Sequence, residues 1–321
     1  MRRTVFAGFA ATAVIAATEA RPQGATTLEA RRRLEFDVPP FVRSDQARWV
    51  GDFDLALEEA LRRNVPIVAV LSDDQSAGFK TVRESVYSQA GFPKFSRQCV
   101  LLAAFDGKAH PAKPRTVRGG EVPWCDLFDC PCDDHRSSFL RVRSAYATRE
   151  YWNPLHVFVA SDGVEVGRVE SHLTTQRQLD DELARVRTTM RPSLDFEEYR
   201  VLLDRLRACV DQREKKGRGN VHDELGRMLA AETKAEKEGG ARRVLKTAAM
   251  RKFVEELRAS LVDEGQGLIE DADEMARARR FEEARKLLLH VRKSFRGLPP
   301  AAAAEKSLAG LPAPPPGRKE E

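Results

Sequence analysis

The sequence predicts an α/β domain followed by an all-helical region, and three observations lead to this fold class. Apolar runs rich in β-branched residues alternate with helical patterns in the first part of the chain. No strand pattern occurs after Leu194. The length of 321 residues suits two folded units, because a single domain usually takes about 100 to 200 residues.

The composition excludes several classes of protein. Hydrophobic residues make up 42% of the chain and charged residues 32%, which rules out collagen-like, wholly disordered and polytopic membrane proteins. The 54 basic and 49 acidic residues give a net charge of +5 and are interspersed. Nucleic-acid binding leaves a patch of one sign instead, so no nucleic-acid partner is expected.

Residues 1–20 predict a secretory signal peptide. Two arginines precede an uncharged run from Thr4 to Thr18, and small residues follow. This run is shorter than the roughly 20 residues that a membrane-spanning helix needs. We expect cleavage near Ala20, a periplasmic or extracellular location, and no transmembrane span in the mature chain. Export would permit disulfide formation.

The predicted elements of the first domain begin after a proline-containing segment, 21–45, which we interpret as a linker. Asp52 is placed to cap a helix whose apolar residues recur at helical spacing. A strand at Pro66–Leu71, a helix at 79–87 and a second strand at 99–105 follow. Continuous apolar runs of this kind predict strands that are buried on both faces.

The domain is completed by a third strand, 155–160, which turns back at Asp162-Gly163 into a hairpin, and by a helix at 174–190. We therefore place the α/β domain at 46–190. A stretch at 106–150 is longer than the core requires and is interpreted as an insertion. Its first half, 107–123, contains Gly, Pro and basic residues without periodicity and predicts a surface loop.

The segment from about Trp49 to Arg187 resembles the thioredoxin-like superfamily, in its exported branch. Three patterns carry the resemblance: the strand VPIVAVL, the helix ending in ESVYS, and NPLHVFVASDGVEV. The resemblance implies a central sheet flanked by helices and a cis peptide bond before Pro154. It also implies a substrate-facing edge at Trp152, Asn153 and Pro154, which favours a protein or peptide partner.

The chain departs from that family at the redox-active Cys-x-x-Cys. The resemblance places this motif on Ser76-Ala77-Gly78-Phe79, and residues 45–98 contain no cysteine. Disulfide exchange needs one thiolate at the helix start and a second thiol to resolve the mixed disulfide. Neither Ser76 nor Phe79 supplies one, so no catalysis is expected at the usual dithiol position.

Three cysteines and a histidine gather instead within eleven residues: Cys125, Cys130, Cys132 and His135. Three interpretations are open. The cysteines form a disulfide, with Cys125 paired to Cys130 or Cys132. All four residues form a Cys3His site for zinc or copper. Cys130 and Cys132 act as a thiol-disulfide exchange pair. No cofactor is certain; zinc and copper are the candidates.

The two remaining cysteines, Cys99 and Cys209, lie on apolar elements and are interpreted as buried structural residues.

The second region, 194–311, shows only helical patterns, interrupted by glycines at 217–220 and 239–240. Its last part, around a link at Arg279–Phe281, is similar to one tetratricopeptide-type hairpin, with a plain helical hairpin as the alternative. Residues 312–321 are proline-rich and predict a disordered tail.

Together these patterns predict an exported thioredoxin-fold protein that lacks the standard dithiol and binds a protein or peptide. Its Cys/His loop binds a metal or forms a disulfide. The alternatives are a thiol-disulfide oxidoreductase that uses Cys130 and Cys132, and a copper- or zinc-handling protein.

Overall fold

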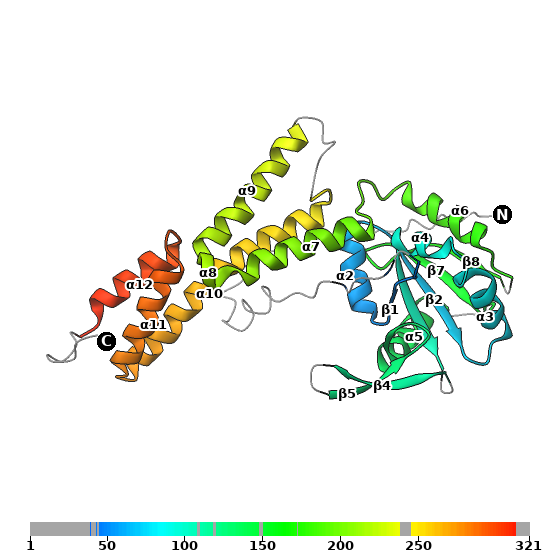
Figure 1. The fold of residues 1–321 in the computed structure, drawn as a ribbon, viewed down its shortest axis with the longest axis horizontal. Coiled ribbons are helices and arrows are strands. Elements are labelled where there is room, and N and C mark those ends of the chain that lie inside the picture. The colour runs from blue at the N-terminus through cyan, green and yellow to red at the C-terminus, as the bar shows by residue number, and fades with distance from the viewer. Residues whose placement is uncertain are drawn as a thin grey trace, which may run out of the picture.

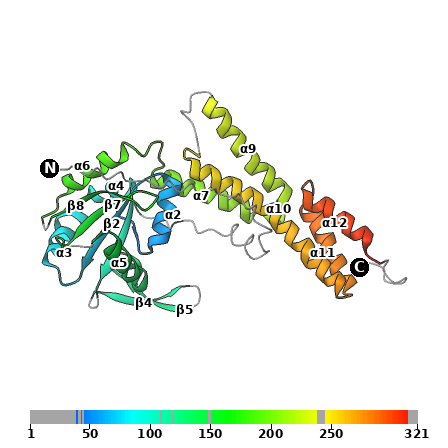
Figure 2. The ribbon, with the colours of Figure 1, turned by 180° about the vertical axis from the view of Figure 1, so that it is seen from behind.

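A five-stranded sheet lies at one end of the molecule, and a row of helices extends from it to the other end (Figures 1 and 2). The computed structural model describes Pro39, Arg43 and residues 45–312, apart from 108–109, 118–119, 148–149, 172 and 238–244. The predicted signal peptide lies outside these residues, as do nearly all of the predicted linker and of the predicted tail.

The central sheet has the strand order β1-β3-β2-β7-β8. Strands β1, β2 and β3 are parallel, and β7 runs antiparallel to both β2 and β8. The bounds are β1 Trp49–Val50, β2 Ile67–Asp73, β3 Val100–Asp106, β7 Leu155–Val159 and β8 Glu165–Glu170. The three predicted strands and the predicted hairpin are thereby confirmed.

Helices cover both faces of this sheet, as the continuous apolar runs predict. On one face, α2 and α5 pack on the odd-numbered residues of β2. On the other face, α3, η1, α4 and α6 pack on Val68, Leu101 and Phe158. The bounds are α2 Phe53–Arg63, α3 Ala77–Val82, the π-helix η1 Arg83–Tyr87, α4 Phe92–Arg97, α5 Cys132–Tyr146 and α6 Gln176–Arg187.

This arrangement is thioredoxin-like, and two local predictions within it are confirmed. Asp52 caps α2 by accepting a hydrogen bond from the backbone of Leu55 at 2.9 Å. The peptide bond between Asn153 and Pro154 is cis.

The predicted surface loop at 107–123 is wrong, because a small antiparallel sheet lies there. It consists of β4 Ala112–Val117, β5 Gly120–Cys125 and β6 Cys130–Pro131. Its side chains are mostly exposed, so no apolar alternation marks its strands. A cross-strand contact stabilises it instead: the guanidinium of Arg115 lies 4.3 Å from the ring centre of Trp124.

The second half of the predicted insertion forms α5, which packs on the sheet through Phe139 and Val142. The Cys-rich stretch therefore connects the small sheet to a helix of the domain core.

The remaining helices form an arm around one long helix, α10. Its first half packs with α7 and α9, and its second half packs with α11 and α12. The bounds are α7 Phe196–Asp211, α8 Arg213–Lys216, α9 Arg218–Lys237, α10 Ala248–Arg277, α11 Phe281–Ser294 and α12 Pro299–Gly310. Within the described residues, no helix combines the length and the apolar character that crossing a membrane requires.

The predicted helical hairpin is present, since α10 and α11 are joined at Ala278–Arg280. Its likeness to a tetratricopeptide repeat stays a prediction. The predicted interruption at 217–220 is shorter than expected, because α9 begins at Arg218. The glycines at 239–240 lie outside the described residues.

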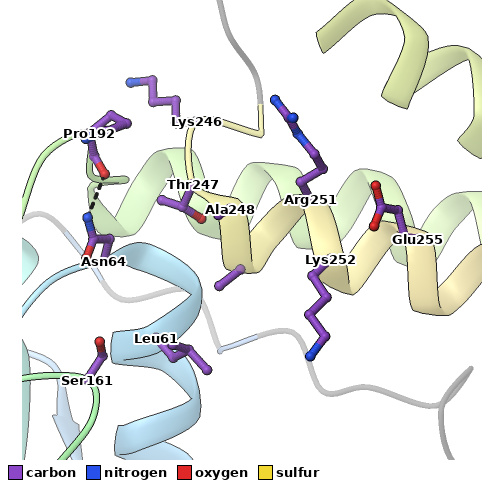
Figure 3. A pocket seen from close by; sticks show the side chains of 11 residues that line it. Leu61, Asn64, Ser161, Pro192, Lys246, Thr247, Ala248, Arg251, Lys252 and Glu255 are labelled. Atoms are coloured by element: carbon purple, nitrogen blue, oxygen red, sulfur yellow. Dashed lines mark hydrogen bonds between the residues drawn. The ribbon is translucent and has the colours of Figure 1, made fainter. Parts of the chain in front are cut away.

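The arm joins the α/β domain at the end of α2. The fully buried Arg63 bonds to Glu59 at 2.7 Å and to the carbonyl of Cys99 at 3.0 Å, and its own carbonyl accepts from the Leu194 amide at 2.8 Å. A cavity of about 490 Å³ lies beside this junction, where the Asn64 side chain donates to the Pro192 carbonyl at 3.0 Å (Figure 3).

Candidate metal centre

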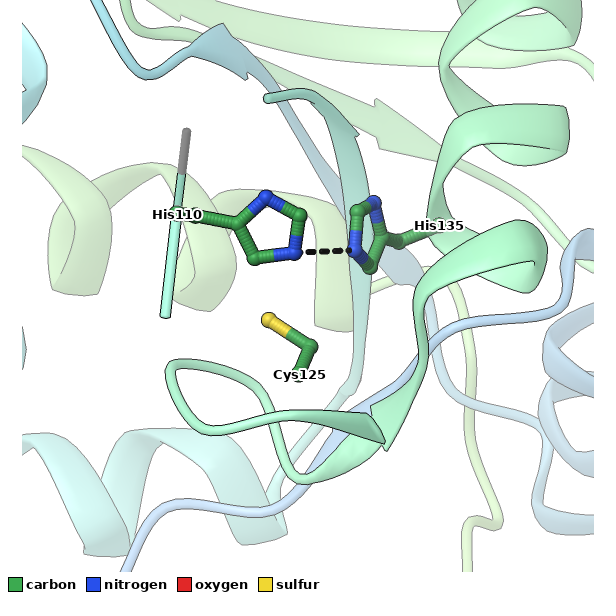
Figure 4. A group of neighbouring side chains, drawn as sticks. All are labelled: His110, Cys125 and His135. Carbon is green, nitrogen blue, oxygen red and sulfur yellow. Dashed lines mark hydrogen bonds between the residues drawn. The ribbon is translucent and has the colours of Figure 1, made fainter. Parts of the chain in front are cut away.

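Three side chains with metal-binding atoms meet where the small sheet joins α5, and a fourth, Cys132, contacts one of them. His110 precedes β4, Cys125 ends β5, and Cys132 and His135 lie on the first turn of α5. The ligand atoms of His110, Cys125 and His135 lie within 4.8 Å of one another (Figure 4). Cys132 joins this group because its sulfur lies 3.2 Å from Nε2 of His110.

Backbone carbonyls orient both histidines. Nδ1 of His135 lies 2.8 Å from the carbonyl oxygen of Phe105, and Nδ1 of His110 lies 2.9 Å from that of Gly107. A carbonyl only accepts hydrogen bonds, so each Nδ1 carries the proton. Each Nε2 is then left with a lone pair, which is the arrangement of a metal-ligating histidine.

The two Nε2 atoms face each other at 3.3 Å (Figure 4). A hydrogen bond between them would require one ring to be a charged imidazolium. Burial lowers the pKa of His135 to about 4, so a proton on this ring is disfavoured at neutral pH. Two nitrogens bound to one zinc at about 2.0 to 2.1 Å lie roughly 3.3 Å apart in a tetrahedral site. The spacing of the two nitrogens therefore fits a shared metal ion.

Cys125 is fully buried, and the backbone amides of Phe128 and Leu127 lie close enough to its sulfur to influence its pKa. Burial raises the pKa of the Cys125 thiol, and these two amides act in the opposite direction. Amide donors stabilise a thiolate, which is the form that binds a metal.

Cys130 is a neighbour of this group but not one of its mutually close ligands. It pairs with Cys125 across the ladder between β5 and β6, and its sulfur packs against Gly51, where a Cβ atom would lie only 2.9 Å away. Of the predicted Cys3His set, Cys125 and His135 belong to the group of mutually close ligand atoms, and Cys132 adjoins it through its contact with His110.

His110 completes the group and was missed by the sequence reasoning. It lies in the stretch that was interpreted as a loop, 15 positions before Cys125. The sequence shows only that His110 lies in the same segment between two core elements as the cysteines. The pairing of the strands in the small sheet brings it into contact with them.

The usual dithiol position carries structural hydrogen bonds. Ser76 caps α3 by accepting from the amide of Phe79 at 3.1 Å, and it donates to the carbonyl of Asn153 at 3.2 Å. The Asn153 side chain accepts from Ser72 at 2.5 Å and donates to Asp73 at 2.6 Å. These polar groups of the predicted peptide edge are thus bonded within the domain, whereas Trp152 is exposed.

An aromatic pocket of about 270 Å³ lies near the candidate metal centre, since the ring centre of Phe128, which lines it, is 6.0 Å from that of His135. Its walls include Trp49, Phe79, Tyr87 and Phe128, and Arg83 also lines it. Phe128 belongs to the loop whose amides lie close to the Cys125 sulfur, so the pocket and the centre share one segment of chain.

Cys130 and Cys132 do not show the lowered pKa that is typical of a catalytic exchange pair. Burial raises the pKa of both Cys130 and Cys132, and neighbouring thiols and carboxylates raise it further. Reactive cysteines have a lowered pKa instead. All five cysteines are free in the structure, and Cys99 and Cys209 are buried in apolar clusters as predicted.

The sequence matches no known family model and no curated protein. Among solved structures, it is similar to a DsbH oxidoreductase, with 12% identity and a TM-score of 0.33 over 50% of this chain and 99% of that chain. It is also similar to a thioredoxin from Thermus thermophilus, with 16% identity and a TM-score of 0.29 over 44% of this chain and 87% of that chain. The function therefore has to be argued from the residues of this chain.

Proposed function

We propose that this protein is an exported, thioredoxin-like zinc protein whose metal ion is held by His110, Cys125, Cys132 and His135. One observation carries the proposal. Two histidines, each anchored through Nδ1 to a backbone carbonyl, place their unprotonated Nε2 atoms 3.3 Å apart beside two cysteine sulfurs.

Zinc fits this group better than copper. Two nitrogens and two sulfurs make a closed, four-ligand set, which is typical of structural zinc sites. Cu(I) favours soft sulfur ligands, whereas two of the four proposed ligands are imidazole nitrogens.

The role that we infer for the zinc ion is to fasten the small sheet to the core. Its ligands come from three segments that precede β4, end β5 and begin α5. Closing these segments around one ion orders the connection between β3 and α5, including the loop that lines the aromatic pocket.

Metal titration tests this proposal. The purified mature chain should bind one zinc ion, with the affinity measured by competition with a chromogenic chelator. The variant His110→Gln should lose at least about 100-fold in affinity, because it removes one ligand of a closed site. Cys209→Ser, which alters a thiol in the arm, is the matched control. Unchanged affinity in His110→Gln would overturn the assignment.

Peptide binding is a second candidate function, and the aromatic pocket favours it. Its volume of about 270 Å³ suits one aromatic side chain, and aromatic walls give such a contact about 0.5–1.5 kcal/mol beyond simple burial. The exposed Arg83 supplies a partner for a carboxylate. We infer that the pocket accepts the C-terminal aromatic residue of a peptide.

The peptide acetyl-Gly-Gly-Phe, with a free carboxylate, is a suitable probe. It should shift the Trp49 indole N–H resonance in NMR spectra, and amidation of the peptide or the variant Arg83→Gln should weaken binding several-fold. A Trp49 resonance that does not respond to the peptide would refute this candidate.

Export is tested separately from both sites. Expression of the full chain in a bacterial host with a secretion system should give an envelope-fraction protein whose N-terminus begins near Arg21. A full-length protein in the cytoplasmic fraction would contradict export.

A further inference from the structure

Cys130 is a third buried thiol beside the proposed centre, and the zinc ion does not use it. It lies directly opposite Cys125 in the antiparallel ladder between β5 and β6. Directly opposite residues in such a ladder have Cα atoms about 4.5 to 5.5 Å apart. A disulfide spans Cα separations of about 4.4 to 6.8 Å. The backbone therefore already holds Cys125 and Cys130 at disulfide distance.

Cys125 thus has two partners that exclude each other. As a thiolate it ligates the metal, and in a disulfide it loses the charge and the lone pair that the metal requires. We propose that an oxidant joins Cys125 to Cys130 and thereby releases the zinc ion, so that the centre is a redox-controlled metal site. This inference rests on the zinc centre proposed above.

The oxidant that we assign is a peroxide, and the reaction balances as follows. The Cys125 thiolate attacks one oxygen of hydrogen peroxide; a sulfur–oxygen bond forms, the oxygen–oxygen bond breaks and hydroxide leaves. The Cys130 thiol then displaces the oxygen from the resulting sulfenic acid, which forms the disulfide and releases water. The two sulfurs lose two electrons, and the peroxide is reduced to water and hydroxide.

The ladder favours Cys130 over Cys132 as the partner. The Cys132 sulfur lies beside Nε2 of His110 and is assigned to the zinc ion, whereas the Cys130 sulfur, which lies next to Gly51, is not assigned as a ligand. A Cys125–Cys130 disulfide leaves His110, Cys132 and His135 in place. Reduction of that disulfide should then restore zinc binding. His110 is half-buried, which gives a molecule as small as peroxide a side from which to approach.

The test uses the full mature chain loaded with zinc and treated with hydrogen peroxide. A chromogenic chelator follows zinc release, and dithiothreitol with added zinc should reverse it. Cleavage at aspartates separates Cys125 from the fragment that contains Cys130 and Cys132. Alkylation followed by tandem mass spectrometry then identifies Cys132 as the thiol that remains free.

The variant Cys130→Ala should bind zinc as the wild type does and should form no disulfide at Cys125 under peroxide, because no opposite thiol resolves the sulfenic acid, which dimedone then labels. Cys130→Ser provides a second variant with the same expectation, and Cys209→Ala is the control that should release zinc at the wild-type rate. A disulfide mapped to Cys125 and Cys132, or a Cys125 that stays reduced while peroxide releases the zinc, would overturn the inference. A wild-type chain that binds no zinc would refute the zinc centre itself, which is a separate failure.

Discussion

Two helices of the α/β domain begin at the same edge of the sheet and carry different chemistry. Helix α3 follows β2 and α5 follows β3 by way of the small sheet, and β2 and β3 are parallel. The Phe105 ring at the end of β3 lies near both helix starts: its centre is 5.0 Å from that of Phe79 and 5.9 Å from that of His135.

The first turn of α3 reads Ser76 to Phe79, and the first turn of α5 reads Cys132 to His135. Both helix starts favour a negative charge, because backbone N–H groups point outward there. At α3, the side chain of Ser76 accepts a hydrogen bond from one of these N–H groups and caps the helix. At α5, residues three positions apart lie on one face, and a cysteine and a histidine at that spacing meet His110 and Cys125. The difference teaches that, at this edge of the sheet, the candidate metal ligands gather at the start of α5 and not at the start of α3.

The largest expected effect is a difference in zinc affinity between variants at Cys132 and at Cys130. Cys132→Ala should lower the zinc affinity at least about 100-fold, because it removes a ligand. Cys130→Ala should leave the affinity within a few-fold of the wild type. Competition with a chelator measures both, and equal losses in the two variants would restore the Cys3His set that the sequence suggested.

The second prediction concerns pH in the metal-free chain. Burial lowers the pKa of His135 from 6.5 in the unfolded chain to about 4. As the pH falls through this window, the unfolded chain takes up the proton first, so folding stability is lost between about pH 6.5 and 4. Linkage gives a loss of about 2 kcal/mol from this residue between pH 7 and 5.

Urea unfolding at the two pH values in a chelating buffer measures this loss. His135→Gln should remove about that amount of the pH dependence, while the contribution of His156, whose pKa burial also lowers to about 4, should remain. An identical pH dependence in wild type and His135→Gln would contradict the buried, neutral state of His135.

A smaller effect is expected from Gly51→Ala, which tests the packing around Cys130. The added Cβ would lie 2.9 Å from the Cys130 sulfur, so the thiol has to move. We expect a destabilisation of about 1–3 kcal/mol, as for other overpacked cores, with zinc affinity retained. Thermal unfolding of the metal-free variant checks the first expectation, and unaltered stability would count against this placement of Cys130.

The smallest effect concerns the other helix start. Ser76→Ala removes the cap of α3 and should cost about 1 kcal/mol without changing zinc affinity. Chemical denaturation and chelator competition on the same sample measure both quantities. A marked loss of zinc affinity in this variant would mean that the two helix starts do not act independently.

The sheet could be predicted from sequence because its signals are local. Pro66–Leu71 is a continuous apolar run, Asp52 precedes an amphipathic helix, and Asp162-Gly163 is a hairpin turn. Each of these patterns depends on near neighbours and on burial on both faces of a central sheet. The cis bond before Pro154 followed from the family resemblance.

The candidate site was only partly predictable, because the residues that form it are brought together by the pairing of β4, β5 and β6. The register of β5 against β6 sets Cys130 opposite Cys125, and the Cys130 sulfur also lies next to Gly51. Sequence spacing alone reveals neither contact. His110 enters the group only because β4 folds back on β5. The exposed strands of that small sheet carry no apolar alternation, so the sequence gives no sign of them.

The central claim is tested most directly by X-ray absorption spectroscopy at the zinc edge of the loaded, full mature chain. The proposed centre predicts two sulfur neighbours at about 2.3 Å and two nitrogen neighbours at about 2.0 to 2.1 Å. The Cys130→Ala variant should give the same spectrum, and His110→Gln should lose one nitrogen of the imidazole type. Three sulfur neighbours, or a zinc shell made of oxygen alone, would contradict the centre formed by His110, Cys125, Cys132 and His135.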